Sequence, residues 1–320
     1  ASGTLIGSPV TFTATGTAGA ATQLQLATQP SPTAQSGVAF AVQPAIRLAD
    51  ALGNPVATSG TVVTAAIGSG TGTLGGTLTA TTVSGVATFT NLAISGTAGA
   101  FTLNFTAGGV TGVSSATITL GAGAANRLAM VVQPSASAQN AIAFPQQPQV
   151  QVQDAAGNPV AGVASVGVAI LTGGGTLGGT TPVSTNAAGL ATFAGLSITG
   201  TVGARTLQFT SAGLAPVTSA AVALAAGTPT QMAVSTGNAQ SATAGSAVAV
   251  DPAVIVRDVS NNPVSGVAVT FAVASGGGSV LPATPVATDA SGIAAATSWT
   301  LGGTAGPNSL TATAAPGGIT

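Results

Sequence analysis

The stretch QVQVQDAAGNPV, residues 149–160, decides the fold class. Its glutamines alternate with Val150 and Val152, which is the pattern of a β-strand with one face in water and the other face buried. The strand runs into Gly157, which can take a positive φ, and Pro159, which fixes φ and has no N–H to donate. A strand that ends in such a turn is typical of an antiparallel β-protein.

This turn occurs three times in the chain, at a spacing of 104 residues. The other two copies read DALGNPV at residues 50–56 and DVSNNPV at residues 258–264. Other positions keep the spacing, for example Phe89 and Phe193. We expect the leading aspartate of each turn to accept backbone N–H bonds in an Asx-type turn. The predicted repeat-turn residues are Asp50, Asn54, Pro55, Asp154, Asn158, Pro159, Asp258, Asn262 and Pro263.

Each copy contains several short alternating stretches separated by glycine-rich turns, such as GSGTGTLGG at residues 68–76, and none has a helical period. This organisation predicts an all-β protein of three tandem immunoglobulin-like β-sandwich domains, arranged as an elongated rod, with an N-terminal extra strand. The predicted boundaries are 1–20 for the extra strand, 21–124 for domain 1, 125–228 for domain 2 and 229–320 for domain 3.

The two ends of the chain do not match a whole number of repeats. The third copy stops before a counterpart of the last strand, which falls at about residues 113–124 of the first copy, whereas residues 9–20 precede the first copy in the register of such a strand. Two interpretations stay open. Either the chain is a window of a longer tandem array, or this segment of one subunit completes domain 3 of the next subunit by strand addition. The candidate donor strand is Pro9, Val10, Thr11, Phe12, Thr13 and Ala14.

Side chains that carry most enzyme chemistry are scarce. The chain has four basic residues, all arginine, five acidic residues, all aspartate, and no His, Lys, Glu, Tyr or Cys. No group is therefore available to activate a serine or threonine, and the sequence predicts no enzyme. Zinc would find neither Cys nor His. Asp251, Asp258 and Asp289 could offer oxygen ligands to calcium, but we interpret them as turn and loop residues, and we predict no metal and no cofactor.

Composition also bears on partners and location. A formal net charge of −1 provides no field for nucleic acid, and no apolar tract approaches the roughly 20 residues of a membrane span. Uncharged β edges favour association with other strands. The predicted partner is therefore the chain itself, as a homopolymer or as tandem neighbouring domains, and a glycan or host-protein ligand stays open.

Trp299 is the single tryptophan, and it aligns with Leu92 and Leu196 of the other copies. We interpret it as a core aromatic of domain 3, because a tryptophan side chain contributes a large buried area. A contact at a domain junction is the alternative.

Several longer segments extend the comparison beyond the turn. They are ATQLQLATQPS at 21–31, LAMVVQPSAS at 128–137, VQDAAGNPVAGV at 152–163, TNAAGLA at 185–191, VRDVSNNPVSGVAVTFAVASGGGSV at 256–280, TDASGIA at 288–294 and LTATAAPGG at 310–318. Over all three copies, they resemble the bacterial immunoglobulin-like domains of the invasin and intimin type. The resemblance implies the sandwich fold and the setting of rod-like stalks of surface adhesins and other secreted repeat proteins, hence an extracellular or cell-surface location. It transfers no functional residue.

The sequence therefore predicts a structural repeat protein that forms an extracellular fibre, stalk or surface layer. Polymerisation head to tail, by complementation of domain 3 with residues 9–20 of a neighbour, is one form of this hypothesis. The alternative is an adhesin stalk or ligand-binding module of a larger cell-surface protein. A third hypothesis is an accessory array attached to a secreted enzyme.

Overall fold

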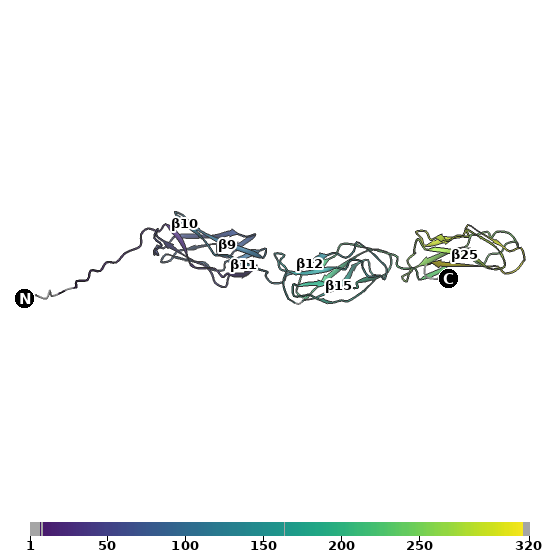
Figure 1. The fold of residues 1–320 in the computed structure, drawn as a ribbon, viewed down its shortest axis with the longest axis horizontal. Helices are drawn as coiled ribbons and strands as arrows, with labels where there is room; N and C mark the ends of the chain where they lie inside the picture. The colour runs from purple at the N-terminus through teal and green to yellow at the C-terminus, as the bar shows by residue number, and fades with distance from the viewer. Residues whose placement is uncertain (1–6, 8, 163, 316–320) are drawn as a thin grey trace, which may run out of the picture. The chain divides into compact units, whose positions relative to one another are not determined.

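The computed structural model of the chain describes residues 7, 9–162 and 164–315, and these residues contain strands and turns but no helix (Figure 1). The chain divides into two compact units, residues 1–125 with 153–160 and residues 126–152 with 161–320. No sheet of the described residues joins strands from two of the 104-residue copies. We name the copies repeat 1 (21–124), repeat 2 (125–228) and repeat 3 (229–320). These domain boundaries stay a prediction, because the compact units divide the chain differently.

Repeat 1 is an immunoglobulin-like β-sandwich. On one side, β3 lies between β1 and β7, with Leu24 opposite Leu48 and Ile46 opposite Ala87. On the other side, β4 pairs with β6 and β9, and β11 lies antiparallel to β9 and parallel to β2. Its strands are β1 Gln23–Thr28, β2 Thr33–Gln35, β3 Ala45–Ala49, β4 Val62–Ser69, β5 Gly72–Gly75, β6 Thr79–Thr81, β7 Val86–Thr88, β8 Ala93–Gly96, β9 Gly99–Ala107, β10 Val110–Ser114 and β11 Ile118–Gly121.

The core of repeat 1 lies between these sheets. Alternate residues of β4, β9 and β11 are buried, and the rings of Phe89 and Phe105 pack with their centroids 5.4 Å apart. The last strand closes the core, because Ile118 and Leu120 of β11 are each only 1% exposed. Burying two such side chains contributes about 1.5–3 kcal/mol each, so β11 is a substantial part of the sandwich.

Repeat 2 has the same arrangement. β14 lies between β12 and β18, and the opposite sheet runs β13-β22-β20-β15-β17. Phe193 and Phe209 repeat the aromatic pair at 5.2 Å, and Val222 and Leu224 of β22 fill the positions of Ile118 and Leu120. Its strands are β12 Arg127–Val132, β13 Ser137–Gln139, β14 Gln149–Gln153, β15 Ser165–Thr172, β16 Thr176–Gly178, β17 Val183–Ser184, β18 Leu190–Thr192, β19 Ser197–Thr199, β20 Gly203–Thr210, β21 Val217–Thr218 and β22 Val222–Ala225.

Repeat 3 keeps the three-stranded sheet β23-β24-β28, but its second sheet is reduced to β27-β25-β30. Among its described residues, no strand occupies the position of β11 or β22, and residues 241–243, the counterparts of β2 and β13, form no strand. Its strands are β23 Gln231–Thr236, β24 Ala253–Arg257, β25 Ala268–Ser275, β26 Gly278–Leu281, β27 Val286–Ala287, β28 Ile293–Ala295, β29 Ser298–Leu301 and β30 Ser309–Ala315.

The core of repeat 3 is also built from smaller side chains. Ala296 and Ala312 stand where the other repeats have their paired phenylalanines. Phe271 of β25 lies opposite Ala312 and takes part of the space, as the counterpart of Ala65 opposite Phe105 in repeat 1. The open sheet and the small residues together leave this sandwich less filled than its neighbours.

The N-terminal segment that the sequence predicts to be an extra strand is not paired in the structure. Residues 9–20 are exposed and carry no strand arrow in Figure 1. Val10 and Phe12 are 70% and 94% exposed. A strand needs a partner for its backbone N–H and C=O groups, and no described strand of this chain supplies one.

Candidate functional site

Each repeat turn is organised by its leading aspartate. In repeat 1, one oxygen of Asp50, Oδ1, accepts the backbone N–H groups of Leu52 and Asn54, at 3.0 and 2.8 Å. The other oxygen, Oδ2, accepts the side-chain amide of Asn54 at 3.0 Å. Asp154 and Asp258 accept the amide groups of Asn158 and Asn262 in the same way. Each turn is therefore held by its own carboxylate, and the proline after the asparagine bridges back to the strand before it.

The same Oδ2 atom also reaches a glycine that precedes the repeat. Gly123 donates its N–H to Asp154 at 2.8 Å, and Gly227 donates to Asp258 at 2.8 Å. Gly19 makes the corresponding bond to Asp50 at 3.0 Å. The separation is 31 residues in each case, so the turn binds the linker that leads into its own repeat.

The turn asparagine binds the preceding repeat. In the first compact unit, Oδ1 of Asn158 accepts the N–H of Ala98 at 2.7 Å, and its Nδ2 donates to the carbonyl of Gly96 at 2.9 Å. In the second unit, Asn262 makes the same two bonds to Val202 and Gly200, each at 2.9 Å. We call this arrangement of linker glycine, turn aspartate, turn asparagine and two loop backbone groups the latch. The latch is a repeated device that fixes a turn to the end of the repeat before it.

The two complete latches are buried. Asp154, Asn158, Asp258 and Asn262 are 2%, 3%, 0% and 4% exposed. In the second unit, Asn140 adds a further donor, because its Nδ2 lies 2.8 Å from Oδ2 of Asp258. Buried carboxylates require such donors, since burying an unpaired charge is costly.

The hydrogen bonds lower the pKa of all three turn aspartates. For Asp50, the Asn54 amide and then the Gly19 N–H lower the pKa from 3.8 to about 2. For Asp154 and Asp258, burial by itself raises the pKa, but donated hydrogen bonds outweigh it and the net pKa lies below the usual value. All three carboxylates are therefore ionised at neutral pH, and hydrogen bonding to the charged form stabilises them.

We expect the stability of the chain to be flat between about pH 5 and 9 and to fall in acid. The folded-state pKa of each turn aspartate is lowered, so the unfolded chain binds more protons in acid. This contribution is complete above the unfolded pKa near 3.8 and is lost as pH falls through the folded pKa, about 2 for Asp50. No His, Cys, Lys, Tyr or Glu adds a further titration. Thermal unfolding followed by circular dichroism from pH 2 to 9 measures this, and a midpoint that moves between pH 5 and 9 would contradict it.

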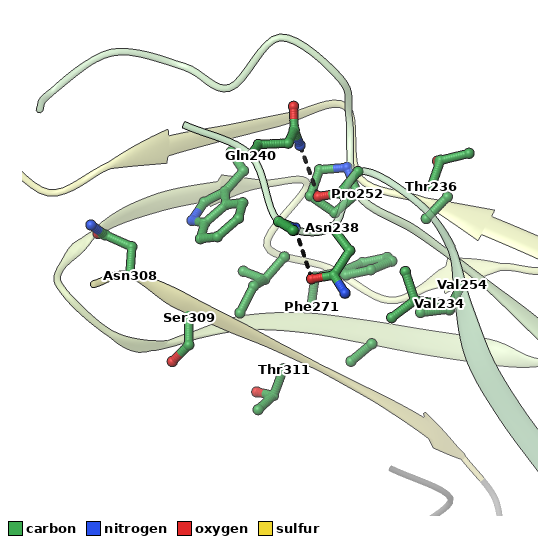
Figure 2. A pocket seen from close by; sticks show the side chains of 16 residues that line it. Val234, Thr236, Asn238, Gln240, Pro252, Val254, Phe271, Asn308, Ser309 and Thr311 are labelled. Carbon is green, nitrogen blue, oxygen red and sulfur yellow. Dashed lines mark hydrogen bonds between the residues drawn. The ribbon is translucent and has the colours of Figure 1, made fainter. Parts of the chain in front are cut away.

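A second candidate site is the open edge of repeat 3. A cavity of about 300 Å³ lies there, with Asn238 and Gln240 on one side and Asn308, together with Ser309 and Thr311 of β30, on the other (Figure 2). Its apolar lining includes Val254, Phe271, Trp299, Leu310 and Ala312.

The cavity lies where repeats 1 and 2 hold their last strand. In repeat 1, Leu103 exchanges two hydrogen bonds with Ser115, just before β11, and the N–H of Thr119 in β11 donates to Pro32. Leu310 and Gln240, the counterparts of Leu103 and Pro32, line the cavity of repeat 3. β30 begins at Ser309, whereas β9 and β20 begin three residues earlier and use those residues to pair with β11 and β22.

Trp299 lines this cavity and is half-buried. Its indole N–H is buried and has no hydrogen-bond partner among the described residues. The tryptophan therefore lies at the edge of the core of repeat 3 and is less buried than the core aromatic that the sequence predicted. Because it is the single tryptophan of a chain without tyrosine, its fluorescence reports on this cavity alone.

The structure separates the predicted site residues into two groups. It places Asp50 against Asn54 and against Gly19 of the N-terminal linker, whereas the candidate donor strand, Pro9 to Ala14, pairs with no described strand. The three aspartates weighed as calcium ligands do not gather, because the described residues contain no cluster of three acidic side chains. Asp289 instead accepts two N–H bonds in its own turn. No helix of the described residues is long and apolar enough to cross a membrane.

Sequence reasoning missed the latch. Its partners are backbone atoms, which leave no residue signature, and the linker residue is a glycine without a side chain. One signal was available, since Gly19, Gly123 and Gly227 recur at the 104-residue spacing.

The sequence matches no protein-family model and no curated protein. Three similar solved structures are the Escherichia coli adhesin FdeC, the bacterial integrin-binding protein invasin and domains 1–6 of the surface layer protein SbsC. FdeC is 18% identical, with 94% of this chain and 95% of that chain covered and a TM-score of 0.43. Invasin is 18% identical, with 91% of this chain and 56% of that chain covered and a TM-score of 0.35. The SbsC structure is 15% identical, with 85% of this chain and 37% of that chain covered and a TM-score of 0.28. At these identities and scores, the fold assignment rests on the sheets described above.

Proposed function

We propose that this protein is a structural repeat protein of the bacterial cell surface or extracellular space that assembles head to tail. In this proposal, residues 9–20 of one copy fill the open edge of repeat 3 in the next copy. The observation that carries it is the cavity of about 300 Å³ at the position of the last strand. Strand addition to an open sheet edge supplies backbone hydrogen bonds, and alternate side chains supply specificity.

The N-terminal segment has the pattern that such an edge requires. Val10, Phe12 and Ala14 alternate with threonines, as Ile118 and Leu120 alternate with Thr119 in β11. In the register that aligns Gly19 with Gly123, Ala14 and Gly16 take the positions of Ile118 and Leu120. In the same register Phe12 takes the position of Ala116, which is exposed in repeat 1 and follows Ser115, the partner of Leu103. Leu310, the counterpart of Leu103, lines the cavity of repeat 3, so we expect the larger Phe12 ring to reach into that cavity. Its 94% exposure in the single chain leaves an aromatic ring in water, and burying it contributes about 1.5–3 kcal/mol.

The experiment compares Phe12→Asp with the wild-type chain. The wild type is expected to form filaments in electron micrographs, with the Trp299 emission shifted to shorter wavelength as the cavity fills. Phe12→Asp is expected to remain monomeric with unshifted emission, because the inserted strand would bury a charge. Thr13→Asp is the matched control. It places the same charge on the other face of the strand, and we expect it to assemble.

A second candidate function is an adhesin stalk or ligand-binding segment of a longer surface protein. The bond from Gly19 to Asp50 favours it, because residues just before repeat 1 already adopt the linker position seen before the other repeats. In that case, a wild-type chain at high concentration stays monomeric, and a peptide of residues 9–20 leaves the Trp299 emission unchanged. Either result removes the head-to-tail proposal.

A further inference from the structure

The turn of repeat 1 carries half of a latch. Asn54 is exposed, whereas its counterparts Asn158 and Asn262 are 3% and 4% exposed. Asn54 donates one amide hydrogen to Asp50, but its Oδ1 and second amide hydrogen have no partner among the described residues. In the complete latches, the same two groups bind a loop of the preceding repeat.

Gly19 also indicates a binding site for a preceding repeat. A Cβ atom on Gly123 would lie 2.3 Å from the carbonyl oxygen of Ser36, and one on Gly227 would lie 2.4 Å from that of Asn140. Those two positions need glycine because a preceding repeat presses against them. A Cβ atom on Gly19 would meet no atom closer than 3.7 Å. Gly19 therefore has the residue type that fits a preceding repeat, although its own chain brings no such crowding.

Repeat 3 carries the other half of the latch, which is the loop whose backbone groups the turn asparagine binds. Gly303 and Ala305 are the counterparts of Gly96 and Ala98, and the loop conformation agrees, since Gly306 and Gly99 have φ values of 155° and 157°. Both residues of this loop are exposed. The carbonyl of Gly303 and the N–H of Ala305 have no hydrogen bond to a described residue.

We propose that the face formed by Gly19, Asp50 and Asn54 docks on the Gly303–Ala305 loop of a second copy of this chain. Oδ1 of Asn54 accepts the N–H of Ala305 in the other copy, and Nδ2 donates to its Gly303 carbonyl. The inference rests on the proposed head-to-tail function and deepens it, because the inserted strand leads directly to Gly19. The occupant is a second copy because the chain uses this same contact twice internally and carries both halves free. Strand insertion joins two copies, and the latch sets the orientation of one on the next.

The test uses two full-length chains that form one defined dimer. The acceptor chain carries Phe12→Asp, so it offers an open repeat 3 but donates no strand. The donor chain has its own repeat 3 closed by a copy of residues 113–123 appended after Thr320. Sedimentation of the mixed chains measures the Kd of the pair.

The latch is then removed from each side. Asn54→Ala in the donor chain and Ala305→Pro in the acceptor chain are each expected to raise the Kd about 10-fold, since each removes hydrogen bonds at the contact. Together they are expected to raise it little more than one alone, because both act on the same contact. Asn104→Ala in the donor chain is the control. Asn104 is exposed and bonded within its own repeat, so the Kd should not change.

The outcomes separate the two proposals. If the parent pair forms no dimer, the head-to-tail function fails and the latch inference fails with it. If the pair dimerises and neither substitution changes the Kd, strand insertion stands and the latch between copies is overturned. Effects that multiply in the double variant would also overturn it, because the two residues would then act at separate contacts.

Discussion

Replacing Asp258 with alanine is expected to lower the free energy of unfolding of repeat 3 by about 3–5 kcal/mol. The side chain is fully buried and accepts five hydrogen bonds, from the N–H groups of Gly227, Ser260 and Asn262 and from the amides of Asn140 and Asn262. Alanine removes both acceptor oxygens and leaves the five donor groups in a site that water does not reach freely. For a domain of this size, the unfolding midpoint should fall by at least about 12 °C.

Trp299 makes the measurement specific, because its emission during heating follows repeat 3 alone. Asp289→Ala is the matched control. Asp289 also accepts two N–H bonds within its turn, at 2.8 and 2.9 Å, but it is exposed and binds no other repeat. We expect its loss to cost about 1 kcal/mol or less. Equal effects of the two substitutions would show that the Asx turn, and not the latch, carries the stability.

The second large expected effect is an increase in the stability of repeat 3. Appending a copy of residues 113–123 after Thr320 is expected to stabilise repeat 3 by about 3 kcal/mol or more, because the added strand buries the counterparts of Ile118 and Leu120. The unfolding midpoint reported by Trp299 should rise by about 12 °C or more. The emission of the folded chain should shift to shorter wavelength, and the extended chain should no longer accept a donor strand.

The control for this chain carries aspartate at both of those apolar positions in the appended segment. It has the same length and backbone, so it tests whether side-chain burial closes the edge. If this control stabilised repeat 3 equally, the cavity would not be the binding site of a last strand.

The sequence was sufficient for the repeat, the all-β class and the turns, because these depend on local patterns. Residues 149–153 form β14, and the Asp-to-Pro turn follows it as predicted. The water-facing side is incomplete, because Gln151 is buried like Val150 and Val152 and donates to the carbonyl of Ala188. Short strands such as β2 and β5 could not be found, since three or four residues rich in Thr and Gly carry no period. They form only because a neighbouring strand pairs with them.

For the two candidate sites too, the features that depend on local sequence were predictable and those that depend on tertiary contacts were not. The sequence suggested an open edge in repeat 3, and among the described residues a cavity lies at this edge. The N-terminal segment was predicted as a strand because it precedes repeat 1 in the register of a last strand, but strand formation requires a partner, and no described strand of the chain pairs with it. The latch could not be predicted from the sequence, because contacts between a carboxylate and the N–H of a glycine 31 residues away depend on tertiary structure.

The position of Gly123 has a mechanical consequence. β11 ends at Gly121, and two residues later the chain is bound to Asp154. A pull on the linker therefore loads the bond to Asp154 before it reaches the ladder of β11. Separation of β11 from its sheet therefore requires the hydrogen bond between Gly123 and Asp154 to break first. Resistance to unzipping is thus shared between adjacent modules, as in arrays whose stability depends on nearest-neighbour coupling.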